Sequence, residues 1–386
     1  MSSSDVIVIG GGIAGVTAAL TTRAAGASVT LIRAAPGATA LSCGGWRGPM
    51  PALITDALSS AGLPYALSPL PLPHPTGELR TYDFASLSHI TDASVNTALV
   101  CGIAGLSGFV APALSRLYAT SDSLRLAHAT AVMEATPPAG WAPLALAAAI
   151  ERDPASFARA VRPLIPRGVT HIITPAVLGL ENGDGVRNAI AREVGIPVVE
   201  GLGATPSIPG LRLDRALMRA LRNAGASIVT GRVTGVNAAG GRVASVTVDA
   251  RSSDAFTAER FVLASGKFLG GGVATRMFEA HEQRLIESAF DLPVWIDHLD
   301  QVFTTAESLT LTSRVRTYDQ PLLRAGVHVD ASHRPVDPRD RALYDNVIAV
   351  GSLLAGTDAG EGLGFACGQA LQAVSQFLSA TSTDGA

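Results

Sequence analysis

The sequence predicts an α/β fold whose parallel sheet binds a nucleotide, and two observations predict it. Near the start of the chain, a short apolar run leads into closely spaced glycines and then into an alanine-rich helical pattern. The same order of apolar run, glycines and helical pattern returns near the end. Strands that alternate with helices form parallel sheets, and glycines between a strand and a helix are typical of phosphate-binding turns.

The first unit predicts a strand over 6–9 and a helix over 14–24. Four consecutive apolar residues suit a parallel strand that is buried on both faces. Between strand and helix, Gly10 permits a tight turn, Gly12 lets the backbone approach a pyrophosphate, and Gly15 lets the helix pack closely on the strand. Because the helix N-terminus faces the anion, this turn predicts a phosphate site.

The end of the second predicted strand, over 28–32, departs from an ordinary dinucleotide site. In such a site an Asp or Glu about 20 residues further on hydrogen-bonds the ribose hydroxyls, and this chain has Arg33 there. A cation suits a phosphate better than a ribose diol. Three interpretations stay open: NADP, an altered flavin site, and a solvated arginine at a strand end.

The middle of the chain, 95–205, predicts an inserted α/β layer. A loop rich in small residues over 34–51 and a proline-rich connector over 64–75, which cannot be helical, precede it. The expected elements of the layer are strands over 96–102, 171–174 and 196–199, with a helix over 185–194.

The last part of the chain returns to the first pattern. The expected elements are a helix over 213–223, strands over 227–230 and 261–264, a hairpin of 233–238 and 243–249 turning at Gly240 and Gly241, and a strand over 346–350 followed by a helix over 366–378. Gly351 ends the final strand, and Gly360, Gly362 and Gly364 precede the final helix. A helix N-terminus here can stabilise negative charge, which supports the interpretation of the first turn.

Composition excludes several classes of protein. The 386 residues allow two domains or one large α/β domain with insertions, and a net charge of −3 disfavours nucleic acid as a partner. The three cysteines are far apart, so no zinc site, cluster or disulfide framework is expected. No uninterrupted apolar run is long enough to span a membrane, and no targeting segment opens the chain, which predicts a cytoplasmic protein.

Taken together, these motifs resemble the fumarate-reductase-like flavoproteins and, within them, the B-subunit family of anaerobic glycerol-3-phosphate dehydrogenase. The order is an N-terminal glycine turn, an Ala-Ser-Gly strand end, and a C-terminal Ala-Val-Gly strand end with a glycine-rich helix start. The segments that carry the family likeness are ALVCGIAGL (98–106), IITPAVLGL (172–180), TPSIPGLRL (205–213), ASGKFLGGG (264–272) and NVIAVGSLLAG (346–356).

The resemblance implies a Rossmann-type flavin-binding domain of the FAD/NAD(P)-binding fold, with the inserted α/β layer and a small cap. We expect the flavin-binding domain to be discontinuous, with the insert over 95–205 and the cap over 281–325; its parts are 1–94, 206–280 and 326–386. The resemblance implies a flavin, FAD or FMN. The family has Arg where Arg33 stands and Ser where Ser352 stands, which weakens contacts to the sugar hydroxyls of FAD and fits FMN, whereas the glycine turn itself suits a dinucleotide.

The family oxidises glycerol 3-phosphate, a small phosphorylated polyol, to dihydroxyacetone phosphate and passes electrons toward quinone. The implied partners are an A subunit, itself a flavoprotein, and an iron–sulfur C subunit through which the complex is attached to the membrane. A location in the cytoplasm, or at the inner face of the membrane through a partner, follows. One departure is the segment Ser42-Cys43-Gly44-Gly45-Trp46, where the family commonly has a Ser-Ser-Gly-type sequence.

The candidate cofactor residues come from the glycine-rich turns and the strand ends. They are Gly10, Gly12, Gly15, Arg33, Ser42, Gly44, Gly45, Ser265, Gly266, Gly351, Ser352, Gly362 and Gly364. Cys43, in the same loop as Ser42, is a redox thiol or a small buried filler. Lys267, the only lysine of the sequence, stabilises the reduced cofactor or is solvated.

Oxidation of a secondary alcohol needs a base beside the hydroxyl and, for a phosphorylated substrate, an arginine. His298 and His328 are the candidate bases, because imidazole titrates near neutrality. Arg334 is the candidate for the substrate phosphate, with Arg314 and Arg316 in the same region. Each has a plain alternative as a structural or surface residue.

Two other functions remain open. In the first, the chain would be a stand-alone flavin dehydrogenase for another small hydroxy acid or amine, which shares the fold of the family and not its substrate. In the second, the chain would be a non-catalytic subunit whose flavin only relays electrons. The lack of a clear set of acid and base residues in the sequence favours this alternative.

Overall fold

The computed structural model describes most of the chain, in two compact units. The described residues are 2–68, 71–74, 78–89, 97–118, 125–134, 136–249, 253–277, 283–296, 299–302, 321–357 and 362–380. Unit 1 comprises Met1–Thr39, Gly48–Ala57 and Leu217–Ala386, and unit 2 comprises Ala40–Arg47 and Leu58–Ala216. The helices α2 (Ala52–Ser60) and α7 (Ile208–Asn223) run from one unit into the other.

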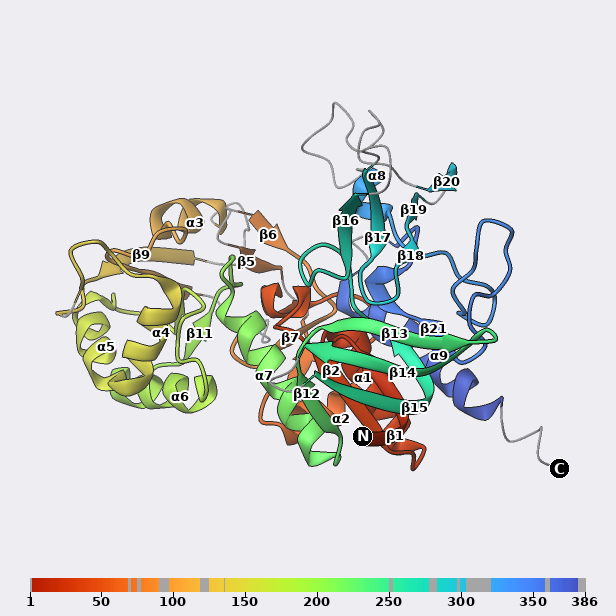
Figure 1. Cartoon of the computed structure of the whole chain (residues 1–386). Helices are drawn as coiled ribbons and strands as arrows, with labels where there is room; N and C mark the ends of the chain where they lie inside the picture. Colours follow the sequence, from red (N-terminus) through yellow and green to blue (C-terminus); the bar gives the residue numbers. More distant parts are fainter. Residues whose placement is uncertain are drawn as a thin grey trace. The chain divides into compact units, whose positions relative to one another are not determined.

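Unit 1 is built on a seven-stranded sheet in the order β12-β2-β1-β15-β14-β13, with β21 paired to β15 (Figure 1). β12, β2, β1, β15 and β21 are mutually parallel, whereas β14 and β13 form an antiparallel extension. The bounds are β1 Ser2–Ile9, β2 Val29–Arg33, β12 Ser227–Thr230, β13 Val233–Ala239, β14 Arg242–Asp249, β15 Ser253–Leu263 and β21 Val347–Ala349.

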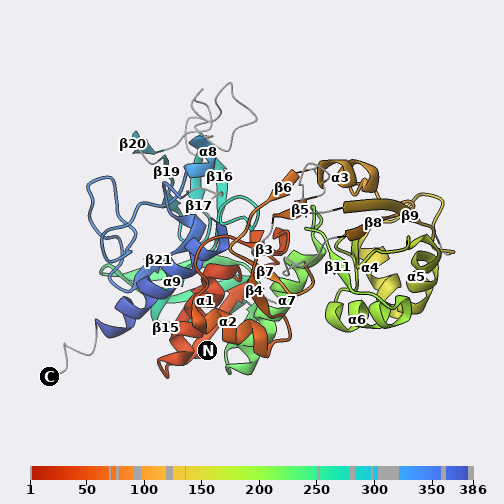
Figure 2. The same cartoon turned by 180° about the vertical axis from the view of Figure 1, so that it is seen from behind.

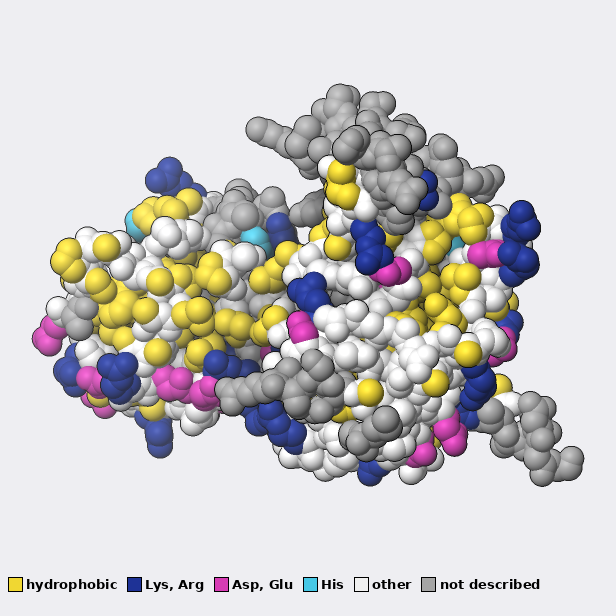
Figure 3. All heavy atoms as spheres, viewed as in Figure 1, with side chains coloured by type: hydrophobic (Ala, Val, Ile, Leu, Met, Phe, Trp, Pro, Cys, Tyr) yellow, Lys and Arg dark blue, Asp and Glu magenta, His cyan; other side chains and the backbone are white. Residues whose placement is uncertain are grey.

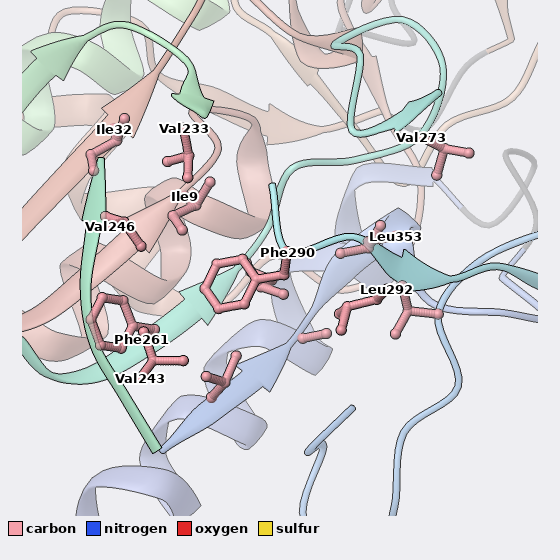
Figure 4. Close-up of a cluster of buried hydrophobic side chains, with 14 of the residues drawn as sticks. Ile9, Ile32, Val233, Val243, Val246, Phe261, Val273, Phe290, Leu292 and Leu353 are labelled. Carbon is pink, nitrogen blue, oxygen red and sulfur yellow. The ribbon is translucent and has the colours of Figure 1, made fainter. Parts of the chain in front are cut away.

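Both faces of this sheet are covered. On one face α1 (Ile13–Ala24) packs beside α9 (Gly362–Ser379), and the two helices lie next to each other in both views (Figures 1 and 2). On the other face Ile7, Ile9 and Ile32 pack into a cluster with side chains of β13, β14 and the 290–294 segment (Figure 4). Burial on both faces explains the continuous apolar run of β1.

The predicted elements of unit 1 are confirmed, and several are longer than the pattern indicated, among them β1, β15 and α9. β1 starts at Ser2, and β15 starts at Ser253, eight residues before the predicted strand. The first half of β15 pairs antiparallel with β14. In this half Phe256 is buried and Glu259 is exposed, so the sequence has no continuous apolar run there from which to predict the strand. The hairpin turns at Gly240 and Gly241, which have φ of 58° and 76°, as a two-residue turn of this hand requires.

Asn346 fastens the end of the sheet where β21 begins. Its side chain is 3% exposed, its Oδ1 accepts the Val243 N–H at 2.9 Å, and its Nδ2 donates to the carbonyls of Val243 and Glu259. We expect Asn346→Ala to lower the free energy of unfolding by about 2–3 kcal/mol, because three buried main-chain groups lose their partner. Urea denaturation checks this, and a loss no larger than for an exposed Asn→Ala change would contradict it.

Smaller elements complete unit 1. β16 (Val273–Met277), β17 (Gln283–Glu287) and β18 (Leu292–Pro293) form one antiparallel sheet, and β19 (Trp295–Ile296) pairs with β20 (Leu299–Val302). α8 is Pro321–Arg324, and the 3-10 turn η4 is Gly351–Leu353. Part of the predicted cap, 281–325, lies outside the described residues, so the cap and the three-part domain division stay predictions.

Unit 2 contains the predicted α/β layer, a parallel sheet in the order β11-β10-β8-β9. The bounds are β8 Thr97–Ile103, β9 Arg125–Ala131, β10 His171–Thr174 and β11 Val198–Glu200, with α3 Ala111–Tyr118, α4 Pro143–Arg152, α5 Pro154–Val161, η2 Arg162–Leu164 and α6 Gly183–Val194. The layer's helices bury Leu146, Phe157 and Ile190 against the sheet. In Figure 3, hydrophobic side chains gather over α3, β9 and α4, and charged ones along α5 and α6.

The remaining strands of unit 2 are short. β3 (Gly45–Trp46), β7 (Phe84–Ser86) and β4 (Tyr65–Leu67) form a three-stranded antiparallel sheet, and β5 (Leu72–His74) pairs with β6 (Glu78–Arg80). The proline-rich connector therefore holds short strands and, in its described residues, no helix. Across the described ranges, no helix has the length and apolar character to cross a membrane.

Candidate functional site

The site of unit 1 lies where the parallel strands end together. β1, β2, β15 and β21 run in the same direction, so their carboxyl ends share one edge of the sheet. Ligands of such sheets bind at this edge. The predicted residues Gly10, Arg33, Ser265 and Gly351 stand at or just after these four ends.

The glycine turn after β1 is held against the end of β15. Gly10 has φ of +118°, and a Cβ there would overlap the carbonyl of Ala264. A Cβ on Gly15 would overlap the carbonyl of Gly10 and lie 3.3 Å from the Ala264 Cβ. These two glycines are therefore required by the chain's own packing, as the spacing predicted.

Gly12 is different, because the protein itself does not require a glycine there. Its φ of −75° suits any residue, and a Cβ would meet only Thr39 Oγ1, at 3.4 Å. The same Thr39 hydroxyl accepts the N–H of Ile13 at 2.9 Å, while the N–H groups of Ala14 and Gly15 have no acceptor within the helix. This open helix N-terminus can hold a phosphate.

Arg33 lies against this turn. Its side chain is 9% exposed, and a Cβ on Gly11 would lie 2.8 Å from Arg33 Cδ and 3.0 Å from its Nε. A guanidinium therefore stands beside the phosphate-binding turn where a dinucleotide site has a carboxylate. The charge suits a phosphate group.

Ser265, two residues after β15, is bound to a carboxyl group that the sequence did not indicate. Its Oγ donates to Glu287 Oε1 at 2.9 Å, and Glu287 Oε2 accepts the N–H groups of Ala289 at 3.1 Å and Phe290 at 2.8 Å. Glu287 is 0% exposed. Burial raises its pKa to about 7, against the three hydrogen bonds and with the help of the Asp291 charge.

The second glycine turn packs on the first helix. A Cβ on Gly351 would lie 2.5 Å from the Ala14 Cβ, and the Gly351 N–H donates to Gln369 Oε1 of α9 at 2.6 Å. Ser352 is exposed, and its Oγ lies 3.8 Å from the place of a Cβ on Gly266. Unit 1 thus brings together the predicted residues of all four strand ends, and Gly362 and Gly364 open α9 beside α1.

The remaining predicted cofactor residues belong to unit 2. The carbonyl of Ser42 accepts the Ser207 hydroxyl, and Gly45 lies against the ring of Tyr82, which a Cβ would overlap. Cys43 Sγ and the Tyr82 hydroxyl are 3.1 Å apart. Burial raises the pKa of Tyr82 to about 12.

Sequence reasoning also missed His89, which is 2% exposed beside Gly44. Its Nδ1 is 2.8 Å from the Glu200 carbonyl, and a carbonyl can only accept, so Nδ1 is the donor and Nε2 keeps a lone pair. Nε2 has no hydrogen-bond partner among the described residues. Burial lowers the pKa of His89, so the ring is neutral at pH 7.

The predicted catalytic residues have the following places. His328 stacks on Trp295, with ring centroids 5.0 Å apart and 13° between the planes. Arg334 pairs with Asp330 at 2.8 Å and lies 3.8 Å from Asp345. His298 lies outside the described residues, as do Arg314 and Arg316. Their roles stay predictions.

Lys267 does not extend into solvent. Its Nζ donates to the carbonyls of Leu323 at 2.5 Å and Thr357 at 2.9 Å. The ammonium therefore joins the loop after β15 to two segments distant in sequence, which is a structural use of this cation.

Comparisons with known proteins agree with a nucleotide-cofactor site in this chain. The sequence model of the family described as FAD dependent oxidoreductase (DAO) matches residues 5–290. A relative from Halobacterium salinarum, named as the probable B subunit of an anaerobic glycerol-3-phosphate dehydrogenase, is 32% identical over 203 residues, 51% of this chain and 44% of the relative. The anaerobic glycerol-3-phosphate dehydrogenase B subunit of Actinobacillus pleuropneumoniae serotype 5b is 25% identical over 215 residues, 55% of this chain and 47% of that protein.

These relatives confirm the resemblance to the B-subunit family, although the chain aligns with less than half of their length. Among solved structures, a 3-ketosteroid-Δ4-(5α)-dehydrogenase from Rhodococcus jostii RHA1 is similar with a TM-score of 0.40 and 14% identity, over 97% of both chains.

Proposed function

Because the chain belongs to the FAD dependent oxidoreductase family, we propose that it acts as the flavoprotein subunit of a glycerol-3-phosphate dehydrogenase. The reaction would be oxidation of glycerol 3-phosphate to dihydroxyacetone phosphate, with electrons passed toward quinone. The flavin follows from the family, and the substrate is supported by relatives named as B subunits of anaerobic glycerol-3-phosphate dehydrogenase. Their names also support a complex with further subunits, for which a flavoprotein (the A subunit) and an iron–sulfur protein (the C subunit) are the proposed partners.

One observation supports the cofactor site most directly: the open N-terminus of α1 at Gly12, with Arg33 against the same turn. The N–H groups of Ala14 and Gly15 would hold a flavin phosphate, and Arg33 would add a positive charge. Both FAD and FMN carry such a phosphate. Arg33 in place of a ribose-binding acid favours FMN, and the glycine spacing favours FAD.

A bound flavin would supply the acceptor for the hydride of the carbinol carbon. The protein must orient that carbon and accept the hydroxyl proton. We keep His298 and His328 as the proposed bases and Arg334 as the proposed ligand of the substrate phosphate. Asp330 and Asp345 beside Arg334 would fix the direction of its guanidinium.

The test has two steps with the purified chain. Denaturation followed by chromatography of the released cofactor distinguishes FAD, FMN and none. Anaerobic addition of glycerol 3-phosphate, with glycerol and a hydroxy acid as controls, should then bleach the flavin selectively, in the isolated chain or only with its partner subunits.

Each outcome of that test decides something. A colourless protein that stays so after reconstitution with FAD and FMN would contradict the proposal. Bleaching by another hydroxy acid or an amine would assign a stand-alone dehydrogenase. Reduction that needs a partner's own active site would leave this flavin an electron relay.

A further inference from the structure

We propose that Glu287 is a positioning residue for the flavin phosphate site and that it works there in its protonated form. The inference needs only that the chain binds a flavin, and it does not depend on the substrate proposed above. It starts from a carboxyl group, buried in unit 1, that the oxidation chemistry does not use.

Glu287 connects the end of β17 to the loop that packs on the phosphate turn. It is the last residue of β17, and it binds Ser265, 22 residues earlier, through the 2.9 Å bond to Oγ. The main-chain nitrogen of Ser265 lies 2.8 Å from the place of a Cβ on Gly10. Ser265 therefore links the two: its side chain binds the Glu287 carboxyl group, and its main chain packs against the glycine turn.

The surroundings of Glu287 suit a neutral carboxyl group. The described ionisable groups that act on it are Asp291, whose charge raises its pKa, and Tyr344. Asp291 is paired with Arg276 at 2.5 Å, and Lys267, on the loop after Ser265, is bonded to two carbonyls. No ion pair to Glu287 is present among the described side chains.

When Glu287 is protonated, its carboxyl group can still make all three hydrogen bonds, although one of them changes direction. The Oε1–H then donates to Ser265 Oγ, reversing that bond, while Oε2 still accepts the N–H groups of Ala289 and Phe290. A phosphate anion at the neighbouring turn disfavours a second negative charge nearby. Flavin binding should therefore increase the proton affinity of Glu287, and a flavin should bind more tightly below pH 7 than above it.

Glu287→Gln is a close mimic of the protonated group. The amide oxygen accepts the two N–H groups, and the amide nitrogen donates to Ser265 Oγ. Apoprotein is titrated with FMN and with FAD from about pH 6 to about pH 8.5, and flavin fluorescence gives Kd. We expect the wild-type Kd for FAD to rise about tenfold across this range, which corresponds to about one pKa unit of coupling, and the Kd of Glu287→Gln for FAD to stay level.

The matched control is Glu259→Gln, the same change at an exposed position of β15, which should keep the wild-type pH profile. Ionisation of the FMN phosphate itself, near pH 6, affects all three proteins equally, so the difference between them reports Glu287. Calorimetry of flavin binding to the wild type at pH 7, in buffers of different ionisation enthalpy, should show net proton uptake that Glu287→Gln lacks.

Parallel pH profiles for wild type and Glu287→Gln, or equal proton uptake, would overturn the inference. Failure of every protein to bind FMN or FAD would overturn it as well, together with the flavin site. Tight, pH-dependent flavin binding without reduction by glycerol 3-phosphate would leave it standing and count against the proposed substrate alone.

Discussion

Gly12→Ala is expected to weaken flavin binding at least tenfold while the stability of the protein hardly changes. The new methyl group would meet only Thr39 Oγ1, at 3.4 Å, and the backbone of Gly12 is already in an ordinary conformation. The methyl group instead occupies space at the helix N-terminus where the phosphate must approach the main-chain N–H groups. Fluorescence titration of apoprotein with FMN and FAD measures the loss, and a thermal melt of the apoprotein measures stability.

Two further glycines make this result interpretable. Gly37→Ala is the matched control, since nothing lies within 4 Å of a Cβ there, and it should change neither quantity. Gly10→Ala should instead destabilise the apoprotein. Gly10 has a φ of +118°, and a methyl group there would overlap the carbonyl of Ala264. If Gly12→Ala binds flavin like the wild type, the phosphate does not bind at this turn.

The contrast between these glycines shows how much of the site could be predicted from sequence. The spacing of Gly10, Gly12 and Gly15 predicted three separate roles, and the contacts of Gly10 and Gly15 agree with theirs. Such motifs can be predicted from sequence because the whole strand–turn–helix unit is continuous in the chain. Arg33 was found by its distance from the turn along the chain, although its packing on Gly11 was not foreseen.

Glu287 and His89 were not found, for a physical reason. Glu287 matters because β17 returns it to Ser265, and His89 because the fold sets it beside Gly44. Neither residue belongs to a local pattern, and tertiary contacts between distant segments leave no periodicity to detect. A glutamate in an otherwise apolar strand end, LIE (285–287), was the one available signal.

The starts of two further helices can be predicted from the sequence. The helices α4 and α5 each begin with a proline, Pro143 and Pro154, and the side chain of Asp153 caps α5 by accepting the N–H of Ser156 at 3.0 Å. Proline at the first helical position after a capping residue is a readable start signal. β9 was harder, because only its last residue is fully buried and its apolar pattern is correspondingly weak.

Unit 2 also contains a polar network that local patterns do not reveal. Arg212 of α7 binds Glu200, at the end of β11, with Nη1–Oε2 at 2.5 Å, and both side chains are under 10% exposed. Arg212 also donates to the carbonyl of Gly179, and Glu200 accepts the N–H of Leu178. Burial raises the pKa of Glu200, but the Arg212 charge and these hydrogen bonds more than offset it, so the pKa lies below its usual range.

Arg212→Ala should therefore be among the most destabilising single changes in the chain, by about 3–5 kcal/mol of unfolding free energy, since it leaves the buried Glu200 carboxylate unpaired. The matched control is Arg215→Ala, on the same helix, whose partner Glu181 is exposed; it should cost well under about 1 kcal/mol. Urea denaturation monitored by circular dichroism compares the two.

A second variant separates the cost of an unpaired charge from the value of the pair. Arg212→Met combined with Glu200→Leu removes both charges and keeps apolar volume, so it should recover a large part of the stability that Arg212→Ala loses. Equal losses for Arg212→Ala and Arg215→Ala would show that Glu200 is not held charged in the folded protein. Recovery in the double variant would instead show that the ion pair stabilises unit 2 less than the destabilisation of the single variant suggests, because most of that loss comes from the orphaned carboxylate.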